Sequence, residues 1–388
     1  MTAYLTIEMA NQRISHAWKT TIQETIEGDE KRSALYTWPR IRLESEMLVF
    51  EDEERRFIHA HLWRDLHNLW GIPIISDETS LTAEAAAAQA VLTVGATDYR
   101  HFYDGRQCIL ISDWESYEVA TITTVDSGTQ ITLSGNLSAT WPAGTKVFPL
   151  YICRVKPEQS RSSKYFKLNE FSIVAEESFE TARTFSYTVP TVDAAVYPVY
   201  NSLNLFLTKP KNPITEGYRH PYTLLGELGL NTSFSTYDDT RIIFDRDFLI
   251  TSKKSVYDLL DFFDAKQGRL KTFYMPTWME DIIISVGFGS ADVTITTKEL
   301  YLTSDEIVGR HVYIRLPDGS YVCREITARP SSTSITLSSA IGTTVATASL
   351  SSMLCCFLYE VRFNIDEIAF EYFKKQTLAQ TTLSFNKI

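Results

Sequence analysis

The chain has 388 residues, a formal net charge of −11 and 12% aromatic residues. The acidic charge is spread along the sequence without a basic stripe, which excludes sequence-specific nucleic-acid recognition as the predicted function. No apolar run approaches the ~18 residues needed to cross a bilayer, and no secretory signal is evident. We therefore predict translation into a cytoplasm without membrane insertion. The five cysteines form no CxxC pair and fall in apolar runs, which predicts buried reduced thiols.

An internal duplication organises the sequence. Residues 105–134 match residues 309–338 without a gap, at an offset of 204 (309 minus 105), with 12 identities in 30 positions. Chance would give roughly two identities at ordinary composition. Three weaker matches extend the repeat: 40–44 with 241–245, 70–73 with 273–276, and 166–170 with 363–367. We therefore predict two units, residues 1–190 and 216–388, with the proline-containing segment 191–215 as the linker between them.

Each unit is predicted to begin with a strand followed by a helix. Within 52–69, Ile58, Leu62 and Leu66 recur at helical spacing, and the acidic run at 51–54 suits a first helical turn. Residues 253–266 predict the second helix in the same way. Gly71 and Gly268 follow the two helices and are predicted as left-handed C-caps. Short apolar strands are expected next, at 70–75 and 270–275.

A package of short strands follows in each unit. The first set is predicted at 91–94, 107–111, 117–125, 130–133 and 146–152, and the second at 293–296, 311–316, 321–327, 334–337 and 354–359. Asp318-Gly319 signals a hairpin turn in the second set. Short strands rich in Thr, Val and Ile at this spacing predict a small SH3-like β-barrel inserted in each unit, at about 90–155 and 291–361.

Two longer strands are predicted to close each unit, at 167–174 with 182–189 and at 362–370 with 380–385. The predicted fold class is mainly β with a few helices (α+β). Each unit would be a strand–helix–strand module that carries an inserted barrel and ends in two strands.

Motifs with catalytic chemistry are not evident in the sequence. It contains no GxSxG, HExxH, Walker or GxGxxG pattern. His59, His61 and His67 fall on the first predicted helix, but His59 and His61 are two residues apart and point to different faces. This spacing disfavours a zinc site.

Two acidic pairs, Asp77-Glu78 and Glu280-Asp281, recur at matching places after the prolines. Adjacent carboxylates within a strand point apart, which favours a structural loop role over a glycosidase pair. We therefore predict no enzymatic activity, no catalytic, cofactor-binding or metal-binding residues, and no cofactor.

A family resemblance enters in the second predicted helix. Residues 259–273 read Leu-Leu-Asp-Phe-Phe-Asp-Ala-Lys-Gln-Gly-Arg-Leu-Lys-Thr-Phe, and Pro276, Trp278 and Asp281 follow. This segment resembles a motif of distal-tail and tail-tip proteins of long-tailed bacteriophages and gene transfer agents. The residues from Trp18 to Pro73 are similar to the opening of tail proteins of the same group. The first unit departs from the motif, because Leu66-His67 replaces Phe-Phe and no Gly-Arg pair follows at the matching spacing.

The resemblance implies a tail-tube-like unit, a β-sandwich or split barrel with one flanking helix, whose strands pair across subunits into a closed ring. It implies a structural virion protein of the tail tip (distal tail or baseplate ring), assembled in the bacterial host cytoplasm. Its partners would be itself, the tail tube protein, and hub, tape-measure and fibre-attachment proteins. Since tube rings are six-fold, a homotrimer with two units per chain would fill six quasi-equivalent places. Six copies with one unit in the ring is the runner-up.

A second hypothesis is a carbohydrate-binding or carbohydrate-active tail protein. Trp114, Tyr117 and Trp141 of the first predicted barrel could form a stacking platform for a glycan. The second predicted barrel has no Trp, so glycan binding would belong to one copy of the repeat.

Overall fold

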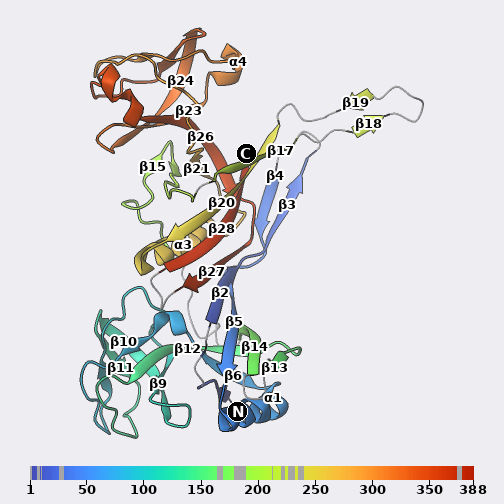
Figure 1. Cartoon of the computed structure of the whole chain (residues 1–388), viewed down its shortest axis with the longest axis vertical. Helices are drawn as coiled ribbons and strands as arrows, with labels where there is room; N and C mark the ends of the chain where they lie inside the picture. The colour runs from blue at the N-terminus through green and yellow to red at the C-terminus, as the bar shows by residue number, and fades with distance from the viewer. Residues whose placement is uncertain are drawn as a thin grey trace.

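The computed structural model describes the chain except residues 1, 7–8, 10, 26–29, 164–168, 179–188, 212, 220–222, 226–231, 235–239 and 374–377. The fold is mainly β, with 48% strand and 12% helix, which confirms the predicted class. Figure 1 shows an elongated molecule in which a central sheet runs between two outlying β packages. We refer to residues up to 178 as the first half and to those from 189 as the second half.

A continuous antiparallel sheet joins the two halves. Across the sheet, the strands follow in the order β13 (Ser160–Ser163), β14 (Asn169–Glu177), β5 (Arg40–Val49), β2 (Asn11–Ala17), β27 (Glu367–Phe373), β28 (Leu378–Lys387), β20 (Arg241–Ile250) and β17 (Thr215–Arg219). The halves meet where β27 pairs with β2, with Phe370 opposite Ile14. Each half therefore contributes four neighbouring strands.

The two sets of four strands have the same connectivity. β5 pairs with β2 and β14, just as β20 pairs with β17 and β28. Within each set, the outer strand pairs in the same way: β13 pairs with β14, and β27 pairs with β28. β14 thus corresponds to β28. The sequence match of 166–170 with 363–367 is therefore wrong as a structural alignment, because 367 lies in β27.

A hairpin follows the first strand of each set. β3 (Thr20–Glu24) and β4 (Glu30–Ala34) connect β2 to β5, and β18 (Thr223–Leu225) and β19 (Thr232–Phe234) lie between β17 and β20. The first hairpin lies against the second half, where Glu30 pairs with Arg362 at 2.7 Å. The second hairpin extends away from the rest of the chain (Figure 1).

The helices α1 (Asp52–Asp65) and α3 (Lys253–Lys266) follow β5 and β20 at the same distance. α1 ends four residues before its predicted end at 69. Gly71 is not a C-cap: it lies in β6 (Leu69–Pro73), which pairs in parallel with β1 (Thr2–Tyr4). A Cβ on Gly71 would meet the Tyr4 ring at 2.5 Å, so this close approach requires glycine. In α3 the left-handed C-cap is Gln267, and Gly268 follows with φ +60°.

An aromatic core lies beneath α3. Phe262 and Phe263 are fully buried and pack with rings from β21 (Phe273–Pro276), β26 (Leu354–Phe363) and β28. The segment 191–215, which its prolines predict as a linker, contributes buried Tyr197 and Phe206 to this core. The same segment contains the short strands β15 (Val199–Tyr200) and β16 (Leu203–Asn204).

Each half carries an inserted package of strands. The first contains β7 (Thr79–Ser80), β8 (Val91–Thr93), β9 (Gln107–Ile111), β10 (Tyr117–Ser127) and β11 (Gln130–Leu133) against β12 (Lys146–Val155), after η1 (Ile75–Asp77). The second contains β22 (Thr294–Thr296), α4 (Ser304–Ile307), β23 (His311–Arg315), β24 (Tyr321–Ser331), β25 (Ser334–Leu337) and η2 (Thr347–Ser352) against β26. Ile122 lies opposite Leu133 in the first, as Ile326 lies opposite Leu337 in the second. This shared register explains the ungapped sequence match.

The strand predicted at 362–370 is interrupted by a turn at Asp366. One carboxylate oxygen of Asp366 accepts a hydrogen bond from the backbone of Thr20 at 2.9 Å, and the other from Arg269 at 3.1 Å. These contacts require a bend, so β26 ends at Phe363 and β27 begins at Glu367. The strand predicted at 182–189 falls almost entirely outside the described residues.

Candidate functional site

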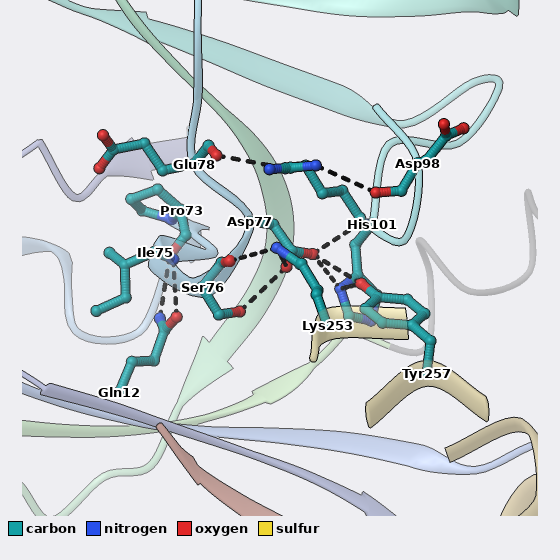
Figure 2. Close-up of polar contacts among 11 residues, drawn as sticks. Gln12, Pro73, Ile75, Ser76, Asp77, Glu78, Asp98, His101, Lys253 and Tyr257 are labelled. Atoms are coloured by element: carbon teal, nitrogen blue, oxygen red, sulfur yellow. Dashed lines mark hydrogen bonds and ion pairs between the residues drawn. The ribbon is translucent and has the colours of Figure 1, made fainter. Parts of the chain in front are cut away.

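A cluster of polar side chains, three of them buried and one partly buried, lies where the first half meets α3 (Figure 2). We call it the junction cluster: Asp77 at the end of η1, His101 in the loop before β9, and Lys253 and Tyr257 on α3. Asp77 is 1% exposed and His101 is 5% exposed. The cluster is therefore built from two elements of the first half and one helix of the second.

Asp77 is the centre of the cluster. Its Oδ2 accepts hydrogen bonds from the backbone N–H of His101 at 2.7 Å, from His101 Nδ1 at 2.5 Å and from the Tyr257 hydroxyl at 2.9 Å. Its Oδ1 pairs with Lys253 Nζ at 2.8 Å. Both carboxylate oxygens are thus satisfied by donors, as a buried charge requires.

The electrostatics favour one arrangement of protons. Burial alone would raise the pKa of Asp77, but His101 and then Lys253 outweigh it and hold that pKa well below its ordinary value. Burial lowers the pKa of His101, against the attraction of Asp77. Burial and Asp77 together raise the pKa of Tyr257 well above its usual range. The consistent state is an ionised Asp77 that accepts from neutral His101 and Tyr257, with Lys253 as its counter-charge.

Two further contacts tie β2 to the same junction. On α3, Asp264 accepts hydrogen bonds from His16 Nδ1 at 2.9 Å and from Trp18 Nε1 at 2.8 Å. Gln12 donates to the carbonyl of Pro73 and accepts from the backbone of Ile75, each at 3.0 Å, so it clamps the entry to η1 (Figure 2). The halves are therefore held together by polar contacts as well as by the β27–β2 strand pair.

Asp77 and His101 of the junction cluster are closed off from solvent, whereas the Lys253 side chain is partly exposed. Two shallow cavities of about 500 and 530 Å³ lie on the outer face of the β27–β2 join, and their lining residues include Arg13, Arg42 and Glu367 but none from the cluster. A general acid or base must reach the reacting atom, and Asp77 and His101 are both buried. The arrangement is that of a structural lock between the halves.

The histidines of the first predicted helix do not come together. His61 pairs with Asp65 at 2.8 Å on α1, and the ring of His59 stacks on Trp63. Within the described residues, no group of three or more His, Cys, Asp or Glu side chains is arranged to hold a metal ion. The five cysteines are free and buried, as predicted.

The two acidic pairs have different surroundings. Asp77 anchors the junction cluster, whereas Asp281 accepts hydrogen bonds from the Thr277 hydroxyl and the backbone of Phe357. Sequence reasoning missed the role of Asp77, because Tyr257 is 180 residues away and no local pattern links the two. The one available signal was the position of the acidic pair directly after the strand that follows each helix.

The predicted aromatic platform does not exist. Trp141 is 6% exposed in the core of the first insert and donates to Glu118 at 2.8 Å. Trp114 packs on Phe57 of α1, with ring centroids 5.3 Å apart. Tyr117 is exposed and lies beside Tyr4. The three rings therefore share no exposed face on which a sugar could stack.

A scan against models of known protein families found no match, and neither did a search of curated proteins. Within the described residues, no helix combines the length and apolar character needed to cross a membrane.

Proposed function

We propose that the protein is a structural component of a bacteriophage tail tip, a distal-tail or baseplate ring that joins the tail tube to hub and fibre-attachment proteins. The resemblance of residues 259–281 to distal-tail and tail-tip proteins motivates the proposal. The observation that carries it is the β27–β2 join, in which one half binds the opposite edge of the other half.

This join is head-to-tail. The second half uses the strand next to β28, and the first half uses the strand next to β5. Contacts between two different surfaces can repeat indefinitely and close into a ring when the rotation per step divides a full turn. In such a ring each half would be a tail-tube-like unit, with the inserted packages outside the sheet.

Three copies are the expected number. Each chain supplies two units with the same strand connectivity, so three chains fill the six places of a ring that matches a six-fold tube. Ring closure also removes the open sheet edges that a single chain leaves at β13 and β17. The alternative of a glycan-binding protein gains no support, because Trp141 is a core residue.

Native mass spectrometry of the purified chain, and of tail tips isolated from virions, tests the proposal. We expect a closed trimer in both samples. Six copies per tail tip would contradict the trimer, and absence of the chain from virions would contradict the function itself.

A further inference from the structure

The two halves differ in what covers equivalent surfaces. The β27–β2 join covers one edge of each half, whereas the other two edges stay open within the chain. Among the described strands, β13 pairs only with β14, and β17 pairs only with β20. β13 corresponds to β27, and β17 corresponds to β2. The same join can therefore form between two copies.

We propose that β13 of one copy pairs antiparallel with β17 of the next copy, and that Trp63 on α1 packs against Tyr218 of that next copy. This inference rests on the proposed ring and names the surfaces that close it. The occupant of each open edge is a second copy of this chain.

The register of the new strand pair follows from the existing one. In the β27–β2 join, Glu371 lies opposite Arg13. Their counterparts are Ser162, paired with Glu170 of β14, and Thr215, paired with Asp245 of β20. Ser162 therefore falls opposite Thr215 of the next copy.

Charge complementarity supports this register. Continued past the start of β13, the same register brings Glu158 opposite Arg219, and both of these side chains are exposed. Opposite charges directly across an antiparallel pair stabilise it, and a slip of one residue would remove the match.

The helices supply an independent observation. Asp264 on α3 contacts His16 of β2 at 2.9 Å across the join. The residue that corresponds to Asp264 on α1 is Trp63, because both helices start at the same distance from their strands. The residue that corresponds to His16 is Tyr218. Trp63 is 86% exposed and Tyr218 is 68% exposed, so the proposed join brings together two large side chains that a single copy leaves in water.

The two hairpins differ in the same way, since one covers a surface within the chain and the other does not. β3–β4 covers Arg362 of the other half, which is 3% exposed. The counterpart of Arg362 in β12 is Arg154, and that side chain is exposed. β18–β19 would cover this surface of the next copy, which accounts for its extension away from its own chain (Figure 1).

Charge exchange is the first test. Glu158→Arg or Arg219→Glu alone should weaken self-association about tenfold, since each places like charges opposite each other, and the double variant should recover most of the loss. Trp63→Ala should weaken association about thirtyfold, as loss of an aromatic anchor does. Tyr301→Ala is the matched control, because Tyr301 is 91% exposed on the second insert and should have no effect. Thermal unfolding of each variant checks that the monomer fold is intact.

A short bifunctional thiol reagent provides the second test. The variant Ser162→Cys with Thr215→Cys should give covalent dimers and trimers, since the native cysteines are buried. Ser162→Cys with Tyr218→Cys is out of register and on the opposite face, and should remain uncrosslinked. If rings still form and none of these variants alters their formation, the proposed interface is wrong and the ring model stands. If the crosslinks form but the copies assemble into open chains, the proposed interface is supported and the closed ring is refuted. A chain that remains monomeric at its highest soluble concentration would overturn both.

Discussion

α1 and α3 occupy the same place in the two halves but have different surroundings. α3 buries Phe262, Phe263 and seven further residues, whereas Ile58 is the one buried residue of α1. The reason lies in the neighbours: α3 is enclosed between its own sheet and the first half, whereas α1 contacts its own sheet and, through Phe57, Trp114 of the first insert. In the proposed assembly, the exposed face of α1 is the surface that a second copy covers.

The edges of the sheet differ in the same way. β27 presents Ile368 and Phe370 to the join, and both are buried. The corresponding positions on the first half are Gln159 and Arg161. In the proposed assembly, a polar edge would limit aggregation of the free chain, whereas the join within one chain can be apolar because it never has to separate.

The equivalent starts of the two helices change the alignment of the segment that resembles tail proteins. Because α1 and α3 start at equivalent points, Phe262-Phe263 corresponds to His61-Leu62 and not to Leu66-His67. The first half thus lacks the two rings at the positions where the second half builds its aromatic core.

The largest expected effect is on that core. Phe262→Ala should lower the free energy of unfolding by about 4 kcal/mol, because it leaves a cavity among fully packed rings. Its ring centroid lies 4.3 Å from that of Tyr197 and 5.0 Å from that of Phe273. His61→Ala, at the equivalent place on α1, should cost less than about 1 kcal/mol. Urea unfolding of both variants measures the difference, and equal losses would contradict the asymmetry between the helices.

Changes in the junction cluster should have the second largest effect on the free energy of unfolding. Asp77→Ala leaves the buried His101 and the partly buried Lys253 without their partner and should cost about 3 kcal/mol. Glu78→Ala is the matched control, since the Glu78 side chain is more exposed and lies 4.0 Å from Lys146 Nζ. Thermal unfolding should separate the two variants by several degrees. A stable Asp77→Ala protein would show that the halves do not depend on this lock.

Gly268→Ala should have a smaller effect, of about 2 kcal/mol. Its φ of +60° disfavours any side chain, and a Cβ there would meet Asp366 Oδ1 at 2.8 Å. Gly309→Ala has a similar backbone cost, with φ +86°, but open space around the added carbon. The difference between the two variants in chemical unfolding therefore isolates crowding at the join, and no difference would argue against close packing there.

The smallest expected effect concerns pH. The folded-state pKa of His101 lies below the ordinary value, so the unfolded chain binds the proton more tightly. Stability from His101 is therefore present above about pH 6.5 and is lost as the pH falls below that value. Asp77, with its depressed pKa, loses its contribution only below about pH 4. His101→Asn should flatten the stability profile between pH 7 and pH 5, and an unchanged slope would show that His101 is not buried as a neutral group.

How much of this could be predicted from sequence depended on the range of the interactions. The helix at 253–266 and the inserted strands follow from local apolar spacing, and the duplication placed them in matching order. The β27–β2 join pairs Ile14 with Phe370, so it depends on contacts between the ends of the chain that leave no local pattern. Burial of Phe206 was hidden by the neighbouring prolines, which are typical of exposed linkers.

The junction cluster was out of reach for the same reason. Asp77, His101 and Tyr257 are ordinary residues in their local sequence, and only the packing of α3 on the first half brings them together. The open edges could be inferred as assembly surfaces only once both halves were seen to share one strand order.

A cryo-electron microscopy reconstruction of the assembled protein tests the central claim most directly. The account predicts a ring of three chains in which the β27–β2 join alternates with a β13–β17 join between copies, with Trp63 beside Tyr218 of the next copy. Six chains in the ring, or halves at clearly different radii with β13 and β17 left unpaired, would contradict it.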